Sequence, residues 1–331
     1  MTHFCDIVFV IMCSRDLVCL QSVTILIATS VVRGSHQGES HGGIFLIDLD
    51  RSRVRQTIDW DTADIDWQGR GWDRGLRGIA FDGDRVFVAA SDELFVYDKD
   101  FKQLTSYRSP YLKHCHEISV FERRLYLTST GYDSILGFDL DANRFSWALT
   151  VSRDREGLRA MPFDPNGRKG PQPSNDLHLN NVFCDTDALY LSGLRTGGLH
   201  AYTGRYLNQF ARLPEGSHNA QPFRGGVLFN DTPKNMVRFV PGQGQQKAFH
   251  VPFYNPKKLA GTDLDDTRVA RQAFARGLCV VQDGLIAAGS SPSTVTLSDL
   301  DSMQTIQSIN LTLDVRNAIH GLEVWPFPLG D

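Results

Sequence analysis

A repeated order of four short apolar segments constrains the fold more than any other feature of this chain. Residues 76–110 contain "LRGIAF", "RVFVAA", "LFVYDKD" and "KQLTSY", and turn residues such as Asp and Gly separate them. Runs of this length, rich in β-branched and aromatic residues, predict short β-strands. The same order recurs at 116–152, 178–213, 218–253 and 276–312. Four strands repeated at a regular interval are typical of a β-propeller.

The two ends of the chain together supply one more unit. The N-terminal part contains three strand-like segments, "TILIATSVV", "GGIFLIDLD" and "RVRQTIDW", and the C-terminal part contains one, "HGLEVWPF". Three strands plus one complete a sixth unit, which closes the ring and leaves only protected edges. No comparable stretch has the apolar period of an amphipathic helix. We therefore predict an all-β protein, a six-bladed β-propeller that occupies residues 23–331 as one domain.

Two insertions interrupt the regular spacing. The steps from residue 77 to 116, 178 to 218 and 276 to 320 are 39, 40 and 44 residues by subtraction, close to the ~40–45 residues of a typical blade. The two longer steps contain loop insertions at 153–177 and 254–275, and each insertion ends just before a unit begins. Long loops at the mouth of a rigid scaffold are commonly functional. We expect both insertions to cover a site.

Residues 1–22 differ from the repeats that follow. Their apolar run, Ile7–Cys13, is followed by Arg15 and Asp16, so it is too short and too polar to span a membrane. No basic segment precedes the run and no small-residue cleavage site follows it, so a secretory signal is not indicated. We expect these residues to be a poorly ordered extension or a mis-annotated start, and we expect no membrane partner.

Cysteine usage and net charge indicate the setting of the protein. Three cysteines lie beyond the extension, at positions 115, 184 and 279, an odd number with unrelated spacings. This pattern argues against a disulfide framework and favours a reducing compartment, which we expect to be the cytoplasm. The formal net charge of -4 gives no indication of a nucleic-acid partner.

Every repeated unit begins with a histidine or an arginine. Aligned on the apolar residue four positions later, the first strands read RGIAF, HEISV, HLNNV, HNAQP, RGLCV and HGLEV. The six initial residues are Arg77, His116, His178, His218, Arg276 and His320. Because the first strand of each propeller blade lines the central channel, these side chains should form a ring near one mouth of that channel.

Such a ring requires ligands that neutralise it. Guanidinium groups facing one another across a narrow channel repel, and burial adds a desolvation cost. A cation bound by neutral imidazoles, with an anion bound by the arginines, removes both problems. Imidazoles suit transition metals, so we expect Fe2+ or Zn2+ on His116, His178 and His218, with His320 as a fourth ligand or a proton donor. Arg77 and Arg276 are expected to bind a small anionic substrate and to act in catalysis.

Polar neighbours of the ring extend this interpretation. Asn180 lies two positions after His178 in a strand, so it should share that side and bind substrate or metal-bound water. Glu117 and Glu323 are expected to be outer hydrogen-bond partners of the metal ligands. The simpler alternatives are that the channel positions are merely polar and hydrated, and that the arginines pair with acids such as Asp73 or Asp314.

The ring also resembles sites in known propeller enzymes. Six units with inner histidines and arginines resemble the peptidyl-hydroxyglycine amidating lyases, in which histidines from separate blades hold zinc and arginines help to bind substrate. The resemblance covers the six ring positions and implies the same roles for them. Four axial histidines are also similar to those that bind ferrous iron in carotenoid cleavage oxygenases, although that family has seven blades. The segment "HLNN" is similar to part of uncharacterised bacterial propeller-like proteins.

Two classes of function follow from the sequence. The first is a metal-dependent enzyme, a lyase or hydrolase with zinc or an oxygenase with iron, acting on a small anionic molecule. The second is a non-catalytic propeller that binds a protein or glycan partner through its loops. The first hypothesis requires a transition metal on the ring histidines, and the second does not.

Overall fold

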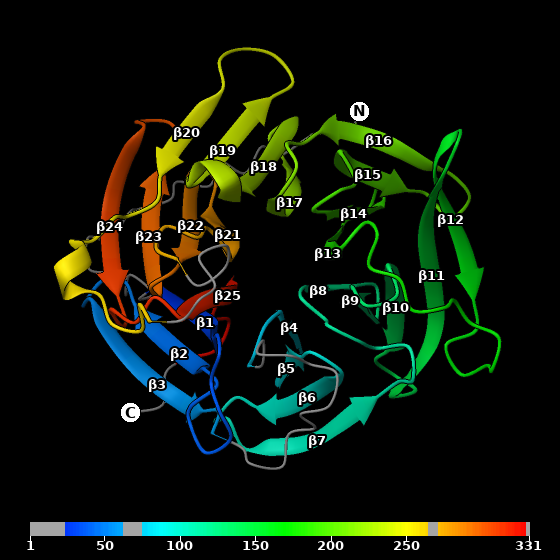
Figure 1. The fold of residues 1–331 in the computed structure, drawn as a ribbon, viewed down its shortest axis with the longest axis horizontal. Helices are drawn as coiled ribbons and strands as arrows, with labels where there is room; N and C mark the ends of the chain where they lie inside the picture. Colours follow the sequence, from blue (N-terminus) through cyan, green and yellow to red (C-terminus); the bar gives the residue numbers. More distant parts are fainter. Residues whose placement is uncertain (1–23, 62–74, 264–270, 329–331) are drawn as a thin grey trace, which may run out of the picture.

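The computed structural model describes residues 24–61, 75–263 and 271–328, and these residues form a six-bladed β-propeller (Figure 1). Six small antiparallel sheets surround a central axis, and the only helices among the described residues are the short 3-10 helices η1 (Thr232–Lys234) and η2 (Pro256–Lys258). The predicted all-β, six-bladed fold is confirmed. No helix in these ranges is long and apolar enough to cross a bilayer. The predicted extension at 1–22 lies outside the described residues.

The first blade joins the two ends of the chain, as predicted. It contains β1 (Ile25–Val32), β2 (Gly43–Asp48) and β3 (Arg53–Asp59), and its innermost strand is β25 (Asn317–Val324). β25 is antiparallel to β1, with Leu26 opposite Val324 and Val32 opposite Asn317. Three N-terminal strands and one C-terminal strand therefore close the ring.

The other blades follow one another along the chain, each with its first strand innermost (Figure 1). The second blade contains β4 (Ile79–Asp82), β5 (Arg85–Ala90), β6 (Glu93–Asp98) and β7 (Gln103–Arg108). The third contains β8 (Ile118–Phe121), β9 (Arg124–Ser129), β10 (Ser134–Asp139), β11 (Arg144–Asp154) and β12 (Gly157–Phe163). The fourth contains β13 (Leu179–Cys184), β14 (Leu189–Gly193), β15 (Gly198–Tyr202) and β16 (Leu207–Arg212).

The last two blades complete the ring in the same way. The fifth blade contains β17 (Ser217–Phe223), β18 (Gly226–Asp231), β19 (Met236–Pro241) and β20 (Lys247–His250). The sixth contains β21 (Leu278–Gln282), β22 (Leu285–Ser290), β23 (Thr294–Asp299) and β24 (Gln304–Asn310). Each first strand thus descends from one mouth of the channel to the other.

The insertion at 153–177 differs from the predicted loop. Its first half is strand β12, which pairs with an elongated β11 from Ala148 opposite Phe163 to Asp154 opposite Gly157. The connecting turn is fixed by the Asp154 carboxylate, which accepts hydrogen bonds from the backbone N–H groups of Glu156 and Gly157 at 2.8 and 3.1 Å. This hairpin adds a fifth strand at the outer edge of the blade. Only the last residues of the insertion return to the axis.

An aspartate ends the third strand of four blades and organises the turn that follows. The Asp139 carboxylate accepts from the backbone N–H groups of Asp141 and Ala142 at 3.0 and 2.8 Å, and Asp299 makes the equivalent bonds to residues 301 and 302. Asp48 and Asp98 likewise accept from the turns that follow them. A short acidic side chain that bonds the backbone ahead of it favours a tight turn. These bonds explain the repeated D-x-D segments of the sequence.

The hydrophobic core is divided among the six interfaces between blades. One cluster, for example, packs Phe87 and Leu94 of the second blade against Leu127 and Phe138 of the third. Equivalent clusters fill the other interfaces. Burial of apolar side chains at ~25 cal/mol per Å² makes each interface a main source of stability.

Glycines allow the inner strands to approach one another near the axis. A Cβ atom on Gly321 would lie 2.3 Å from the carbonyl oxygen of Arg77, and one on Gly78 would lie 2.7 Å from the backbone nitrogen of Ile118. Real Cβ atoms do not approach so closely, so a larger residue would push neighbouring blades apart. The Arg-Gly and His-Gly pairs at the start of three units therefore serve the packing of the ring.

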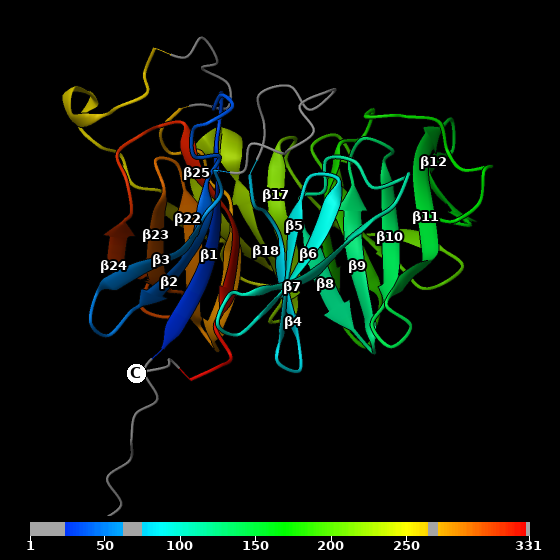
Figure 2. The same cartoon turned by 90° about the horizontal axis from the view of Figure 1, so that it is seen from below.

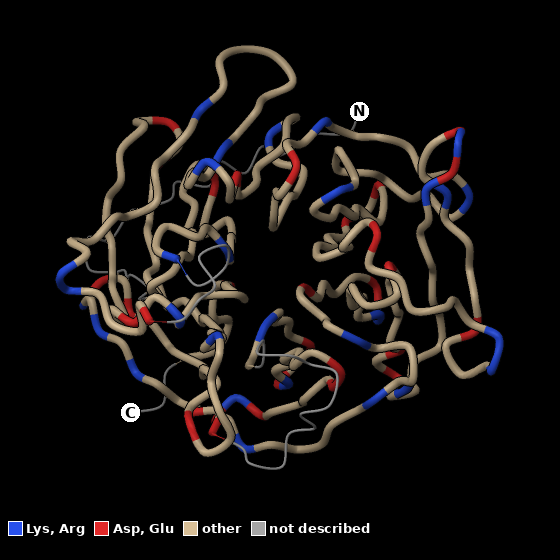
Figure 3. Tube along the Cα trace, viewed as in Figure 1, with Lys and Arg blue, Asp and Glu red and all other residues tan. Residues whose placement is uncertain are grey.

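The two mouths of the channel differ. The segment that carries η2 projects from one face, which we call the upper mouth, and the hairpin turn after β4 lies on the opposite face, the lower mouth (Figure 2). Lysines and arginines are interspersed with acidic residues around the outer edge (Figure 3). The projecting part of the second insertion therefore distinguishes the upper mouth from the lower mouth.

Candidate functional site

A cavity of about 590 Å³ opens at the upper mouth, and we call it the upper cavity. Four histidines line it, and they are residues 114, 116, 178 and 218. Three arginines and one aromatic residue also line it, and we call them the arginine wall: Arg33, Arg271, Arg276 and Phe274, whose ring centroid lies 5.9 Å from that of His218. No aspartate or glutamate is among its lining residues within the described ranges. The upper cavity therefore combines imidazole and guanidinium groups.

The structure brings several of the ring residues into contact. The ring centroids of His116 and His178 are 5.4 Å apart, and those of His116 and His320 are 6.2 Å apart. A guanidinium nitrogen of Arg276 lies 3.3 Å from each ring nitrogen of His320. Arg77 and His320 are fully buried, at 0% and 2% exposure, and neither lines the upper cavity. They lie behind the side chains that form its wall.

Hydrogen bonds fix which ring nitrogen carries the proton in three of the four cavity histidines. The Nδ1 of His116 lies 2.8 Å from the carbonyl oxygen of His114, an acceptor, so Nδ1 must donate. The Nδ1 of His218 lies 2.8 Å from the Thr232 hydroxyl, whose own proton is donated to the carbonyl of Ala275. In a neutral imidazole the other nitrogen, Nε2, then carries the lone pair.

His178 follows the same rule. Its Nδ1 lies 2.9 Å from the side-chain oxygen of Asn175, which accepts the proton and leaves the lone pair on Nε2. The backbone of His178 has a φ of 54°, in the left-handed region that non-glycine residues rarely adopt. Strained backbone of this kind is concentrated at functional sites. Asn175 comes from the end of the first insertion, so that insertion does contribute to the site.

Burial and neighbouring charges keep the rings of His116 and His218 neutral. Desolvation, followed by the charges of Arg77 and Arg276, holds the pKa of His116 well below its usual value of 6.5. Desolvation and Arg276 have the same effect on the pKa of His218. The Nε2 atom of His218 is buried and has no hydrogen-bond partner among the described residues. The cavity thus contains a basic nitrogen that the fold does not use.

His320 is held in the neutral form by the arginines around it. Its pKa is well below 6.5 because of desolvation and then the charges of Arg276, Arg77 and Arg33. A guanidinium group can only donate hydrogen bonds, and Arg33 also approaches the Nε2 of His320 at 3.5 Å. An imidazolium would point both of its protons at cations. The geometry therefore favours His320 as an acceptor.

In the arginine wall, three arginines lie close to one aromatic ring. The guanidinium carbons of Arg33, Arg271 and Arg276 lie 5.4, 5.2 and 5.0 Å from the centroid of Phe274. Cations within about 6 Å of an aromatic face are stabilised by the ring quadrupole. The hydrogen bonds of Arg271 go to neutral oxygens of Asn235, Gln272 and Thr232. This wall is suited to an anion.

Part of the arginine wall lies outside the predicted ring positions. Arg33 follows the end of β1, and Arg271 and Phe274 belong to the end of the second insertion, so none occupies a ring position. His114, which is not a ring position, also lines the upper cavity. The only signal for Arg271 and Phe274 was that their insertion ends just before a ring residue. His114 and Arg33 had no signal in the repeat.

Other predicted neighbours of the ring lie elsewhere. Asn180 is 2% exposed, does not line the upper cavity, and neither atom of its amide has a partner among the described residues. Glu117 and Glu323 line a different cavity, so the outer partners of the histidines are the acceptors described above. Asp314 pairs with Arg316 at 2.8 Å, and Asp73 lies outside the described residues.

The predicted metal site is not assembled in the described part of the chain. Within residues 24–61, 75–263 and 271–328, no group of three or more His, Cys, Asp or Glu side chains is placed to hold a metal ion. The donor chemistry nevertheless suits a metal, since ligating histidines characteristically donate one N–H to a fixed acceptor and bind metal through the other nitrogen. Residues 116, 178 and 218 satisfy the first condition.

Comparisons with known proteins show the fold and no family. No family model matches the sequence, and no curated protein matches it. A chain from the nidogen/laminin complex is similar with a TM-score of 0.58 and 12% identity, over 92% of this chain and 98% of that one.

Two further solved structures are similar to this chain. A protein of unknown function from Bacteroides caccae is similar with a TM-score of 0.52 and 8% identity, over 91% of this chain and 98% of that one. A streptogramin B lyase has a TM-score of 0.49 and 11% identity, over 91% of this chain and 98% of that one. At these identities, the two likenesses with a TM-score above 0.5 show the fold alone.

Proposed function

We propose that this protein is a metal-dependent enzyme that acts on a small anionic molecule in the upper cavity. The observation that carries the proposal is the shared arrangement of His116, His178 and His218, each of which donates Nδ1–H to a protein acceptor and keeps its lone pair on Nε2. These rings and the arginine wall line one cavity. Neutral imidazoles beside cations are suited to a reaction on an anion.

The arginines would bind and orient the substrate. Arg276 and Arg271 lie on the same wall as Phe274, and a planar guanidinium binds carboxylate, phosphate or sulfate through paired N–H donors. Arg77 lies deeper, and its positive charge reinforces the field while it also keeps the histidines neutral. The apolar ring of Phe274 excludes water from one side of the bound anion.

The histidines would hold the metal and accept a proton. His116, His178 and His218 would bind Zn2+ or Fe2+ through Nε2, while His320, whose ring nitrogens lie against Arg276, would remain a hydrogen-bond acceptor behind the upper cavity. A bound ion would supply Lewis-acid chemistry in a lyase or hydrolase, or redox chemistry in an oxygenase. Binding requires the three rings to turn toward one another. A ring that does not bind the ion is a neutral base at Nε2.

Elemental analysis of the purified protein tests this proposal. After expression in medium supplemented with zinc or iron, we expect wild type to contain about one transition metal per chain. His178→Ala and His218→Ala should lose at least about tenfold of that metal, while His250→Ala, an exposed histidine elsewhere, should retain it. A wild-type protein without stoichiometric metal would refute the metal-dependent reaction.

One observation favours the alternative, a propeller that binds a protein or glycan through its loops. The β11–β12 hairpin extends the third blade outward and exposes 54% of Met161. Exposed methionines adapt readily to partner surfaces. This function predicts no stoichiometric metal and no effect of His178→Ala on binding, so the same measurement separates the two proposals.

A further inference from the structure

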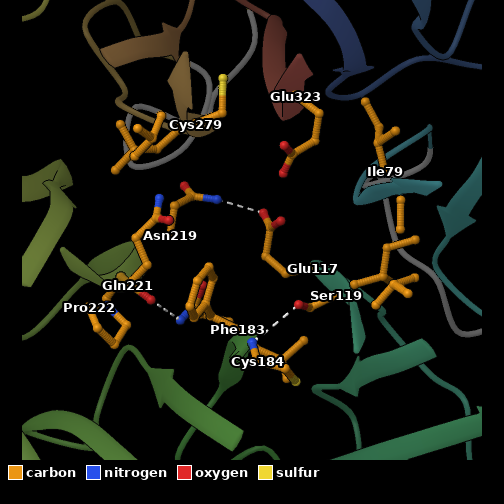
Figure 4. Close-up of a pocket in the computed structure, with 18 of the residues that line it drawn as sticks. Ile79, Glu117, Ser119, Phe183, Cys184, Asn219, Gln221, Pro222, Cys279 and Glu323 are labelled. Carbon is orange, nitrogen blue, oxygen red and sulfur yellow. Dashed lines mark hydrogen bonds between the residues drawn. The ribbon is translucent and has the colours of Figure 1, made fainter. Parts of the chain in front are cut away.

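A second cavity, of about 530 Å³, lies at the lower mouth and shares no lining residue with the upper cavity. We call it the lower cavity. Glu117, which directly precedes β8, and Glu323 of β25 extend into it from different blades (Figure 4). The function proposed above does not use either carboxyl group. The lower cavity is therefore an independent place to look for a ligand.

The fold leaves one of these carboxyl groups without a partner. Among the described residues, Glu323 makes no hydrogen bond and no ion pair, although its side chain points into the lower cavity (Figure 4). Burial of an ionised group without a partner is costly. Desolvation accordingly raises the pKa of Glu323 to about 8. A buried carboxyl group with a structural role normally has a hydrogen-bond donor beside it. Glu323 has none among the described residues, so its carboxyl group is available to a ligand.

Glu117 is held in a fixed position beside it. The Asn219 side-chain nitrogen donates to Glu117 at 2.6 Å (Figure 4). The oxygen of the same amide accepts from Asn230 and from the backbone of Gly277, both at 3.0 Å, so the amide cannot turn over. Desolvation and then the charge of Glu323 raise the pKa of Glu117 to about 8. The charge of Glu323 therefore affects the ionisation of Glu117 across the lower cavity.

The rest of the lower cavity combines aromatic side chains with neutral polar ones such as Ser119, Asn181 and Gln221. Its lining includes Phe81, Phe183 and Phe223 at the ends of three first strands. Phe81 packs edge-on against Trp325 with centroids 5.9 Å apart, and Phe223 packs against Phe239 at 5.6 Å, so these rings are held in place. A ligand for this cavity must combine an apolar body with a group that pairs with carboxylates.

We propose that the lower cavity binds an organic ammonium ion with an aromatic body, whose nitrogen lies between Glu117 and Glu323 while its ring contacts the phenylalanines. A positive group allows Glu323 to ionise, which removes the cost of leaving that carboxyl group buried and unpaired. Aromatic faces add a favourable cation contact. A bare metal ion fits less well, because Glu117 and Glu323 are the only carboxyl groups among the described lining residues and the phenylalanines offer no metal ligand.

Binding should be coupled to proton release. Glu323 holds its proton at pH 7, because desolvation raises its pKa to about 8. Among the described residues, the other charged or titratable groups that act on this pair are Arg276 and Arg77, which favour the ionised form of Glu117, and the buried thiols of Cys115 and Cys279, whose pKa values burial raises. An ammonium ion favours deprotonation, so its affinity should increase as the pH rises from 6 to 8.

Calorimetric titration of the full chain with phenethylammonium chloride tests the proposal. We expect saturable binding at pH 7 that is accompanied by proton release, measured as a dependence of the heat on the ionisation enthalpy of the buffer. The neutral analogue 2-phenylethanol should bind at least about tenfold more weakly, since hydrogen bonds to charged groups contribute ~1.5–3 kcal/mol. Sodium chloride at equal ionic strength serves as the salt control.

Two matched variants make the result specific. Glu323→Gln retains shape and should weaken phenethylammonium binding by about tenfold or more, whereas Asp187→Asn, which changes an exposed acid on a turn, should leave it unchanged. Unchanged far-ultraviolet circular dichroism establishes that each variant is folded. The proposal is refuted by an absence of saturable binding, by equal binding of the alcohol, or by an unchanged affinity in Glu323→Gln. His218→Ala should not affect this binding, so a failure of the proposed enzyme function is separately visible.

Discussion

Replacement of Glu323 by glutamine should make the protein more stable at high pH. The pKa of this carboxyl group is 4.5 in its ordinary environment and about 8 in the folded protein. The folded state therefore retains a proton that the unfolded state has lost between these two values. Its contribution to stability is fully present below pH 4.5 and is lost as the pH rises through 8.

The size of the effect follows from the same two values. At 1.36 kcal/mol per pH unit, a rise from 4.5 to about 8 corresponds to a loss of about 5 kcal/mol above pH 8. Water that enters the lower cavity when the group ionises reduces this loss, so we expect an observed value between ~2 and 5 kcal/mol. Glutamine has almost the same shape and cannot ionise. It also removes the repulsion that raises the pKa of Glu117.

Equilibrium unfolding in urea at pH 5 and pH 9 measures this difference. Wild type should lose stability between the two values, and Glu323→Gln should lose at least ~2 kcal/mol less. The two proteins should differ little at pH 5, where both carry a neutral side chain at this position. Asp187→Asn, an exposed change, should follow wild type. If wild type and Glu323→Gln lost stability in parallel from pH 5 to pH 9, the assignment of a buried and unpaired Glu323 would be wrong.

Three further predictions concern the ring and its packing. His116, His218 and His320 have pKa values well below 6.5 in the folded protein, so each should lower stability by up to ~1.4 kcal/mol per pH unit as the pH falls below 6.5. Thermal denaturation at a series of pH values should show a smaller decrease of stability with pH for His218→Gln than for wild type. Thr232→Val removes the acceptor of the His218 Nδ1 proton, so it should weaken metal binding by ~10–100-fold while Thr232→Ser retains it, as judged by metal titration. Gly321→Ala would place a Cβ atom 2.3 Å from the carbonyl oxygen of Arg77 and should cost at least ~1–3 kcal/mol in urea unfolding; an unchanged midpoint would contradict the close packing of the inner strands.

Much of the fold could be predicted because its information is local and repeated. Each strand has its own apolar run, and an aspartate such as Asp139 marks the turn after the third strand. Closure between β25 and β1 was predictable from a count, since three strands at one end and one at the other leave no other complete blade. The β12 strand was missed because "GLRAMPF" contains an arginine and a proline, and only its pairing with β11 stabilises it.

The candidate site was predictable only where it follows the repeat. The ring positions occur at one register, so the sequence alone is sufficient to group His116, His178 and His218. Arg271 and Phe274 reach the same cavity through an insertion, whose path depends on contacts between distant segments. Glu117 and Glu323 were expected to support the histidines because they are close in sequence. The strand geometry instead directs them to the lower cavity.

Closure of the ring by β25 has a consequence for synthesis. β3 ends at residue 59 and β25 begins at residue 317, so about 260 residues separate the strands of one sheet. At ~5–20 residues per second, the edge of β1 remains unpaired for roughly 13 to 50 seconds while the other blades emerge. An unpaired apolar edge readily captures other strands. The edge of β1 is therefore unpaired during most of the synthesis of the chain. We expect chaperones to affect the yield of folded protein more than its final stability.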